Sequence, residues 1–91
     1  MVIRVTRGRL GGADPDEFSR VSNEQTMASA RALPGLRSFH IGIDRQAGTF
    51  VGVSVWDTAE QSPAIGAHRG ALEALGAQFE STETFEVVSQ L

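Results

Sequence analysis

Two histidines, His40 and His68, are the only side chains of this 91-residue chain that ordinarily titrate near neutral pH. Either could act as a general base toward a bound ligand. His68 lies on an apolar stripe with Ile65 and Leu72, where a hydrogen-bonded core histidine is the alternative. His40 stands beside Gly42, and a small neighbour in a strand leaves space for a ligand or for a packed helix. The sequence thus offers His68 and His40 as candidate catalytic residues and keeps a structural role open for both.

Four further residues could bind a small ligand. Phe50, Ser54 and Trp56 share one face of an expected strand, because side chains alternate along a strand with a period of two. A lone tryptophan at a strand end most often belongs to the core, and that role is compatible with forming the wall of a pocket. Arg4 could bind an anionic or phenolate oxygen, although an ion pair with a glutamate of the last expected strand is the favoured interpretation. The candidate substrate-binding residues are therefore Trp56, Ser54, Arg4 and Phe50.

Several kinds of chemistry find no support. The chain has no cysteine and hence no disulfide, and two histidines are too few for an ordinary structural zinc site. The hydrolase motif GxSxG is also missing, because Gly52-Val53-Ser54-Val55 lacks its second glycine. We therefore predict no metal site and no serine or cysteine nucleophile.

The charge pattern argues against a polyanionic partner. Net charge is −3, there is no lysine, and only Arg4, Arg7 and Arg9 lie close together in the sequence. A nucleic-acid surface needs clustered cations, so none is expected. No apolar run approaches the about 20 residues of a membrane span, and the first ten residues alternate like a strand rather than a signal peptide. We expect a cytoplasmic protein without a nucleic-acid or membrane partner.

The elements that must position these side chains follow from periodicity and from turn residues. Strands are predicted over residues 2–10, 37–44, 49–56 and 82–89. One helix is expected to begin at the cap Asp14 and to end before Pro34; a second, interrupted one should run from Thr58 to Phe79. The order is β-α-β-β-α-β, an α+β ferredoxin-like domain spanning residues 1–91, with two helices on one face of a four-stranded antiparallel sheet.

The other face of that sheet needs a cover. If Ile43 pairs with Thr49 or Val51 in the hairpin, six apolar side chains share this face: Phe39, Ile41, Ile43, Val51, Val53 and Val55. An apolar sheet face of that size favours association, so we predict a homodimer in which two sheets pack together. Trp56 then points beneath the helices, and we expect one edge of its indole to line a cavity near His68.

Three stretches carry a resemblance to a known family. In these stretches the chain resembles the antibiotic biosynthesis monooxygenase (ABM) domains of the dimeric α+β barrel superfamily. The stretches are VSVWDTAEQ, which begins within the third strand, the preceding loop LPGL, and the N-terminal IRVTRGRL…DEF. The resemblance implies a homodimer and a sheet–helix cavity. It also implies a monooxygenase that uses no metal or flavin, in which a deprotonated, electron-rich aromatic or polyketide-like substrate reacts directly with dioxygen. The alternative is a non-catalytic small-ligand-binding or structural module on the same fold.

Haem-degrading relatives of that superfamily use an Asn on the first strand, a Trp at the end of the third and an iron-binding His on the next helix. Trp56 and His68 could match the last two, but the first strand contains no Asn. The segment SPAIGAHRG around His68 also has a proline and two glycines where a ligand helix should be rigid. We therefore expect no haem and no other cofactor.

Overall fold

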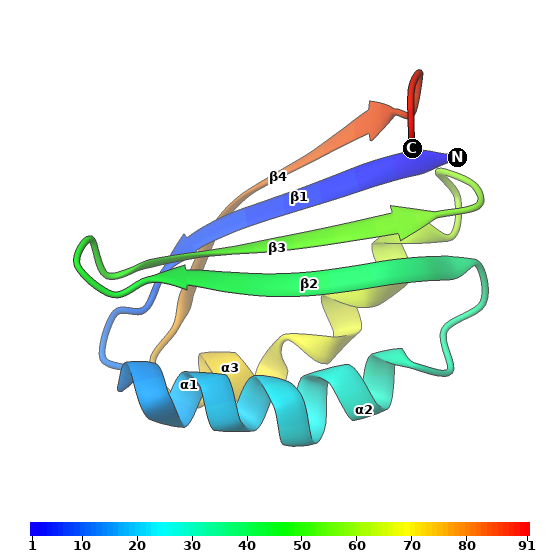
Figure 1. The fold of residues 1–91 in the computed structure, drawn as a ribbon. Helices are drawn as coiled ribbons and strands as arrows, with labels where there is room; N and C mark the ends of the chain where they lie inside the picture. Colours follow the sequence, from blue (N-terminus) through cyan, green and yellow to red (C-terminus); the bar gives the residue numbers. More distant parts are fainter.

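Four antiparallel strands form one sheet in the order β2-β3-β1-β4, and the helices all lie on one side of it (Figure 1). The structure is a computed structural model that describes residues 1–91. The strands are β1 (Val2–Arg9), β2 (Leu36–Asp44), β3 (Thr49–Trp56) and β4 (Gln78–Glu86). The predicted ferredoxin-like α+β fold is confirmed.

The first helical stretch is continuous but changes its winding. It comprises α1 (Pro15–Val21), a π-helical turn η1 (Ser22–Thr26) and α2 (Met27–Ala30). As expected, the Asp14 carboxylate caps its start by accepting from the N–H groups of Asp16 and Glu17 at 3.1 and 3.0 Å. In the π turn the N–H of Met27 donates to the carbonyl of Ser22, five residues earlier. The wider turn was not predicted, and such turns are frequent at functional sites.

The second helical stretch is shorter than expected. It consists of a 3₁₀ helix η2 (Ser62–His68) and one α turn, α3 (Gly70–Glu73). The predicted start at Thr58 is wrong, because η2 starts after Gln61 and has no side-chain cap. Gly76 then takes φ +110°, a conformation that ends a helix, and β4 begins at Gln78 rather than at residue 82. Phe79 therefore belongs to a strand and not to the helical stripe of His68.

The predicted hairpin register is wrong by one residue. Ile43 pairs with Phe50, and Ile41 pairs with Gly52. The turn explains this register, since the Asp44 carboxylate accepts from the N–H groups of Gln46 and Ala47 while Asp44 pairs directly with Thr49. A one-residue shift moves a whole strand's side chains to the other face. Phe39, Ile41 and Ile43 consequently lie on the face covered by the helices, and not beside the valines.

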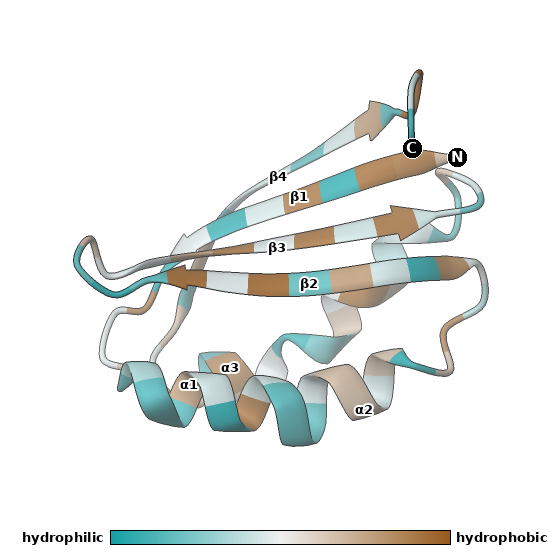
Figure 2. Ribbon diagram, in the orientation of Figure 1, coloured by the Kyte–Doolittle hydropathy of each residue, from teal (hydrophilic) through white to brown (hydrophobic).

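The two faces of the sheet therefore differ in composition. The covered face, beneath the helices, carries alternate residues of β3, namely Phe50, Gly52, Ser54 and Trp56. The open face carries the other residues of β3 and their partners on β1: Val51, Val53, Val55, Ile3 and Val5. Apolar residues recur along β1, β2 and β3 accordingly (Figure 2). Every one of the five open-face side chains just named is partly exposed in the single chain.

Candidate active site

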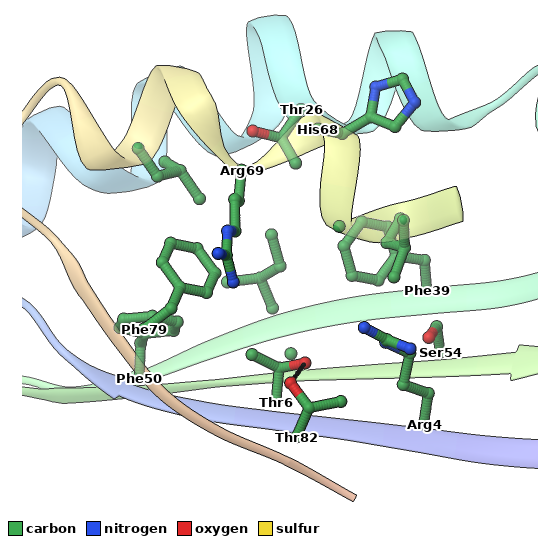
Figure 3. Close-up of a pocket in the computed structure, with 15 residues that line it drawn as sticks. Arg4, Thr6, Thr26, Phe39, Phe50, Ser54, His68, Arg69, Phe79 and Thr82 are labelled. Atoms are coloured by element: carbon green, nitrogen blue, oxygen red, sulfur yellow. Dashed lines mark hydrogen bonds between the residues drawn. The ribbon is translucent and has the colours of Figure 1, made fainter. Parts of the chain in front are cut away.

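A cavity lies between the covered face of the sheet and the helices (Figure 3). It measures about 50 Å³ as the space open to the centre of a water-sized sphere, which is room for a few water molecules. On one side it is closed by an aromatic cluster, in which the ring of Phe50 lies 5.1 Å from that of Phe18 and 4.9 Å from that of Phe79. On the other side are Phe39, Ile65 and Gly66. The cavity therefore interrupts a core that is otherwise well packed.

Four of the six candidate site residues line this cavity. Arg4 reaches it from β1, Phe50 and Ser54 from β3, and His68 from the end of η2. Arg4 and Ser54 are direct cross-strand partners, which explains why they face the same space. His68 is the one histidine that lines the cavity, so it is the only candidate base there. Figure 3 shows its ring in the helical layer, turned away from Arg4 and Ser54, and the residue also borders a second hollow between the helices.

Trp56 is placed differently from the expectation. Its side chain is fully buried on the covered face, but it does not line the cavity. Its Nε1–H donates to the hydroxyl of Ser54 at 2.8 Å. The indole thus belongs to the core and acts on the cavity only by orienting Ser54, which does line it. The indole misses the cavity because Trp56 is the last residue of β3, two positions beyond Ser54.

His40 also lies away from the cavity. It pairs with Val53 in the β2–β3 ladder and is exposed on the open face. The observed hairpin register explains this position. It differs by one residue from the predicted register and so exchanges the two faces of β2. Gly42 beside it leaves no space beneath the helices, and the cavity contains Gly52 instead. The structure therefore does not bring His40 and His68 together.

Arg4 is electrostatically unusual. The favoured ion pair with a glutamate of the last strand is not formed, because Glu83 pairs instead with Arg7 at 3.1 Å. The Nε atom of Arg4 is buried and has no hydrogen-bond partner. Burial, and secondarily the charge of Arg69, lowers the pKa of the Arg4 guanidinium from its ordinary value. An unpaired cation thus faces the cavity.

Sequence reasoning missed four polar residues that line the cavity, namely Thr6, Thr26, Arg69 and Thr82, of which Arg69 and Thr26 matter most for its chemistry. Arg69 follows His68 directly and lies over the ring of Phe79, with Cζ 5.2 Å from the ring centroid. Thr26 ends the π turn, and its buried hydroxyl lines the cavity without a hydrogen-bond partner. The position of Arg69 next to His68 was a usable signal. The π turn leaves no recognised mark in the sequence, so Thr26 could not be found in the same way.

Solved structures of other proteins share the fold of this chain. SnoaB from Streptomyces nogalater, a cofactor-independent oxygenase, superposes with a TM-score of 0.76 and 27% identity, covering 99% of this chain and 95% of its own. A protein from Deinococcus radiodurans assigned to the antibiotic biosynthesis monooxygenases has a TM-score of 0.67 at 16% identity, covering 100% of this chain and 96% of its own. The chain has the ABM fold. No family model matches it, and no curated protein matches it in sequence.

The ABM resemblance deduced from the sequence is thereby confirmed. In this ABM-type domain no three histidine, aspartate or glutamate side chains come together as a metal site would require. None of its helices has the length and apolar character needed to cross a bilayer. The site groups at hand are one histidine, two arginines, several hydroxyls and three aromatic rings. This set can bind an aromatic ligand, accept one proton and stabilise negative charge.

Proposed function

We propose that this chain is an ABM-type monooxygenase that acts on a small aromatic or polyketide-like substrate without a metal or flavin. The observation that carries the proposal is the whole-chain likeness to SnoaB, a cofactor-independent oxygenase. The cavity supports it, because the reaction needs an apolar space with one proton acceptor and donors for a developing anion.

In the proposed reaction, His68 accepts a proton from an activated methylene group of the substrate. The resulting carbanion transfers electrons to dioxygen, and one oxygen atom is retained as a ketone. The other leaves as water, so that R₂CH₂ and O₂ give R₂C=O and H₂O. Arg4 and the hydroxyl groups of the cavity stabilise negative charge as it develops. No external reductant is needed, because the substrate supplies all four electrons.

The size of the cavity sets a condition on this reaction. A space for a few waters does not hold an aromatic ring system, so side chains must move when the substrate enters. Arg69 is one lining side chain that can shift, since about half of it is exposed, at 48%.

The test is oxygen consumption with 1,8-dihydroxyanthrone, whose methylene group is acidic and whose quinone product absorbs differently. We expect the wild-type protein, treated with a chelator, to consume one O₂ per quinone formed. His68→Gln should lose roughly a hundredfold in rate, because a glutamine cannot accept the proton. His40→Gln is the matched control, and its rate should be unchanged.

Two outcomes would contradict the proposal. Equal rates for wild type and His68→Gln would remove the histidine from the reaction. Binding of the anthrone without oxygen consumption would favour a non-catalytic binding module. A titration with haemin belongs beside this assay, because a Soret shift abolished by His68→Ala would instead support the haem-degrading alternative.

We further propose that the protein is a homodimer, formed through the open face. The register places a continuous apolar strip there, with Ile3 opposite Val55 and Val5 opposite Val53. Phe85 extends the strip onto β4 beside Ile3, and 47% of its surface is exposed. A strip of this kind on a single chain is typical of an association surface. The proposed interface keeps the valines of the sequence-based prediction and replaces its β2 residues.

A further inference from the structure

Arg4 differs from the other arginines of its strand. Arg7 and Arg9 are exposed and form ion pairs with Glu83 and Glu80 at 3.1 and 3.3 Å. Arg4 has no ion pair, although it lies on the same strand. Its neighbours across the sheet are Ser54 and Thr84, neither of which is charged. Placing a cation partly inside a protein without a partner costs free energy, so a packing role alone does not account for it.

The Arg4 side chain points across the cavity toward the helical layer. A Cβ atom on Gly66 of η2 would come within 3.9 Å of its Nη2 atom, so the guanidinium lies close to the opposite wall. Its buried Nε has no acceptor. At least one N–H group therefore points toward protein or cavity without a hydrogen bond, which is a defect that a ligand oxygen would repair.

Arg69 approaches the same space from the opposite wall. Figure 3 shows its side chain descending from the helical layer while Arg4 rises from the sheet. Arg69 forms one loose, half-exposed ion pair outside the cavity, with its Nε 3.7 Å from Oε1 of Glu73, a distance too long for a hydrogen bond. No aspartate or glutamate lines the cavity. Two guanidinium groups thus share one small cavity with no negative charge inside it.

Like charges in a shared, partly desolvated space repel each other. Burial is the main cause that lowers the pKa of Arg4, and repulsion by Arg69 is the second. An anion between the two groups would convert this repulsion into attraction. A planar guanidinium donates two parallel N–H groups to a carboxylate, which makes that group a better match than a single charged oxygen.

We propose that Arg4 and Arg69 form a carboxylate-binding subsite, and that the ligand of this cavity is an aromatic carboxylate. The carboxylate lies between the two guanidinium groups, and the ring lies toward Phe39 and Ile65 on the apolar side. The inference rests on the proposed function only in using the same cavity. It assigns the arginine pair to binding and orientation, and leaves proton transfer to His68.

The test compares 2-naphthoate with 2-naphthamide, which has the same ring and nearly the same shape but no charge. Binding is measured by calorimetry, so no turnover is required. We expect wild type to bind the naphthoate at least about tenfold more tightly, as charge-assisted hydrogen bonds imply. Arg4→Gln and Arg69→Gln should each remove most of this preference while leaving the amide's affinity nearly unchanged.

Arg7→Gln is the matched control, because Arg7 is on the same strand but exposed and away from the cavity. It should keep the full preference for naphthoate. Arg69 is half-exposed, so its variant should fold even if Arg4→Gln does not. Equal affinities for the two probes in wild type, no binding of either at millimolar concentration, or loss of preference in Arg7→Gln would overturn the proposal. A naphthoate preference without oxygen consumption from the anthrone or from an anthrone carboxylic acid would uphold it and reject the oxygenase.

Discussion

The covered and open faces of the sheet come from the same strands but carry opposite kinds of residue. On β3 the covered face has Phe50, Ser54 and Trp56, all buried, whereas the open face has three valines that are only partly buried. Polar atoms without partners also lie on this side, on Arg4 of the covered face and on Thr26 of the π turn above it. Unpaired polar groups are costly in a core, so they mark the covered face as the place for a ligand.

The open face lacks comparable groups. Its centre is a strip of β-branched side chains on the two central strands, flanked by the exposed His40 on β2. β-branched residues present a stiff, regular surface that packs well against another sheet. The difference teaches that period-two alternation can give one strand two functions, with chemistry on one side and association on the other.

The largest effect is expected at the covered face, from Trp56→Ala. The indole is fully buried and holds the Ser54 hydroxyl, so its loss leaves a cavity and an unpaired polar group. We expect a decrease of about 3–5 kcal/mol in the free energy of unfolding, measured by urea denaturation followed by circular dichroism. Trp56→Phe, which keeps an aromatic ring, should lose clearly less. A loss below about 1 kcal/mol for the alanine variant would mean that the indole is not a core residue.

A smaller but more specific effect is expected at the open face, from Val53→Asp. In a symmetric dimer the substitution would place two carboxylates in one apolar interface. We expect the dissociation constant to rise at least about a hundredfold, an interfacial loss of about 2.7 kcal/mol. Val53→Thr, similar in shape but uncharged, should weaken the dimer much less. Light scattering checks both variants, and a wild-type protein that is monomeric at micromolar concentration would contradict the proposed interface.

The sequence predicted the covered face better than the open one, for a physical reason. On β3 alternation alone placed Phe50, Ser54 and Trp56 together, and the structure confirms that grouping. On β2 the same alternation was assigned to the wrong face, because it groups Phe39, Ile41 and Ile43 without saying which face of β3 they join. Only the turn geometry at Asp44 distinguishes the two registers. Hydrophobic pattern sets the period of a strand, whereas its phase relative to a neighbour is set by the turn.

The site was predictable to the extent that it lies on strands. Arg4, Phe50 and Ser54 follow from strand periodicity, and His68 follows from being one of only two histidines. Thr26 depends on a π turn, whose extra residue per turn shifts every later side chain around the helix axis. A helical pattern with 3.6 residues per turn cannot locate a residue beyond such a shift. The sequence therefore predicted the parts of the wall that β1 and β3 form, misplaced Phe39 and Ile41 of β2, and predicted only part of the wall formed by the helices.

The smallest effect is expected from two arginines of β1, one on each face. Replacing each by methionine should change the free energy of unfolding in opposite directions. Arg7 is exposed and paired with Glu83, with 59% and 52% of the two side chains accessible. Arg7→Met should therefore lower the free energy of unfolding by at most about 1 kcal/mol. Arg4 is unpaired, and methionine fills a similar volume without charge. Arg4→Met should leave stability unchanged or raise it by about 1 kcal/mol, as replacement of a poorly compensated buried charge often does.

The same two variants separate stability from binding. Arg4→Met should lose the preference for 2-naphthoate over 2-naphthamide while its unfolding midpoint in urea stays level or rises. Arg7→Met should show the reverse, a slightly lower midpoint with the preference intact. Such opposition is expected where a side chain is retained for a ligand at some cost in stability. If Arg4→Met were instead strongly destabilised, by more than about 2 kcal/mol, its guanidinium would be a structural group satisfied within the fold, and the covered face would lose its strongest mark of a ligand site.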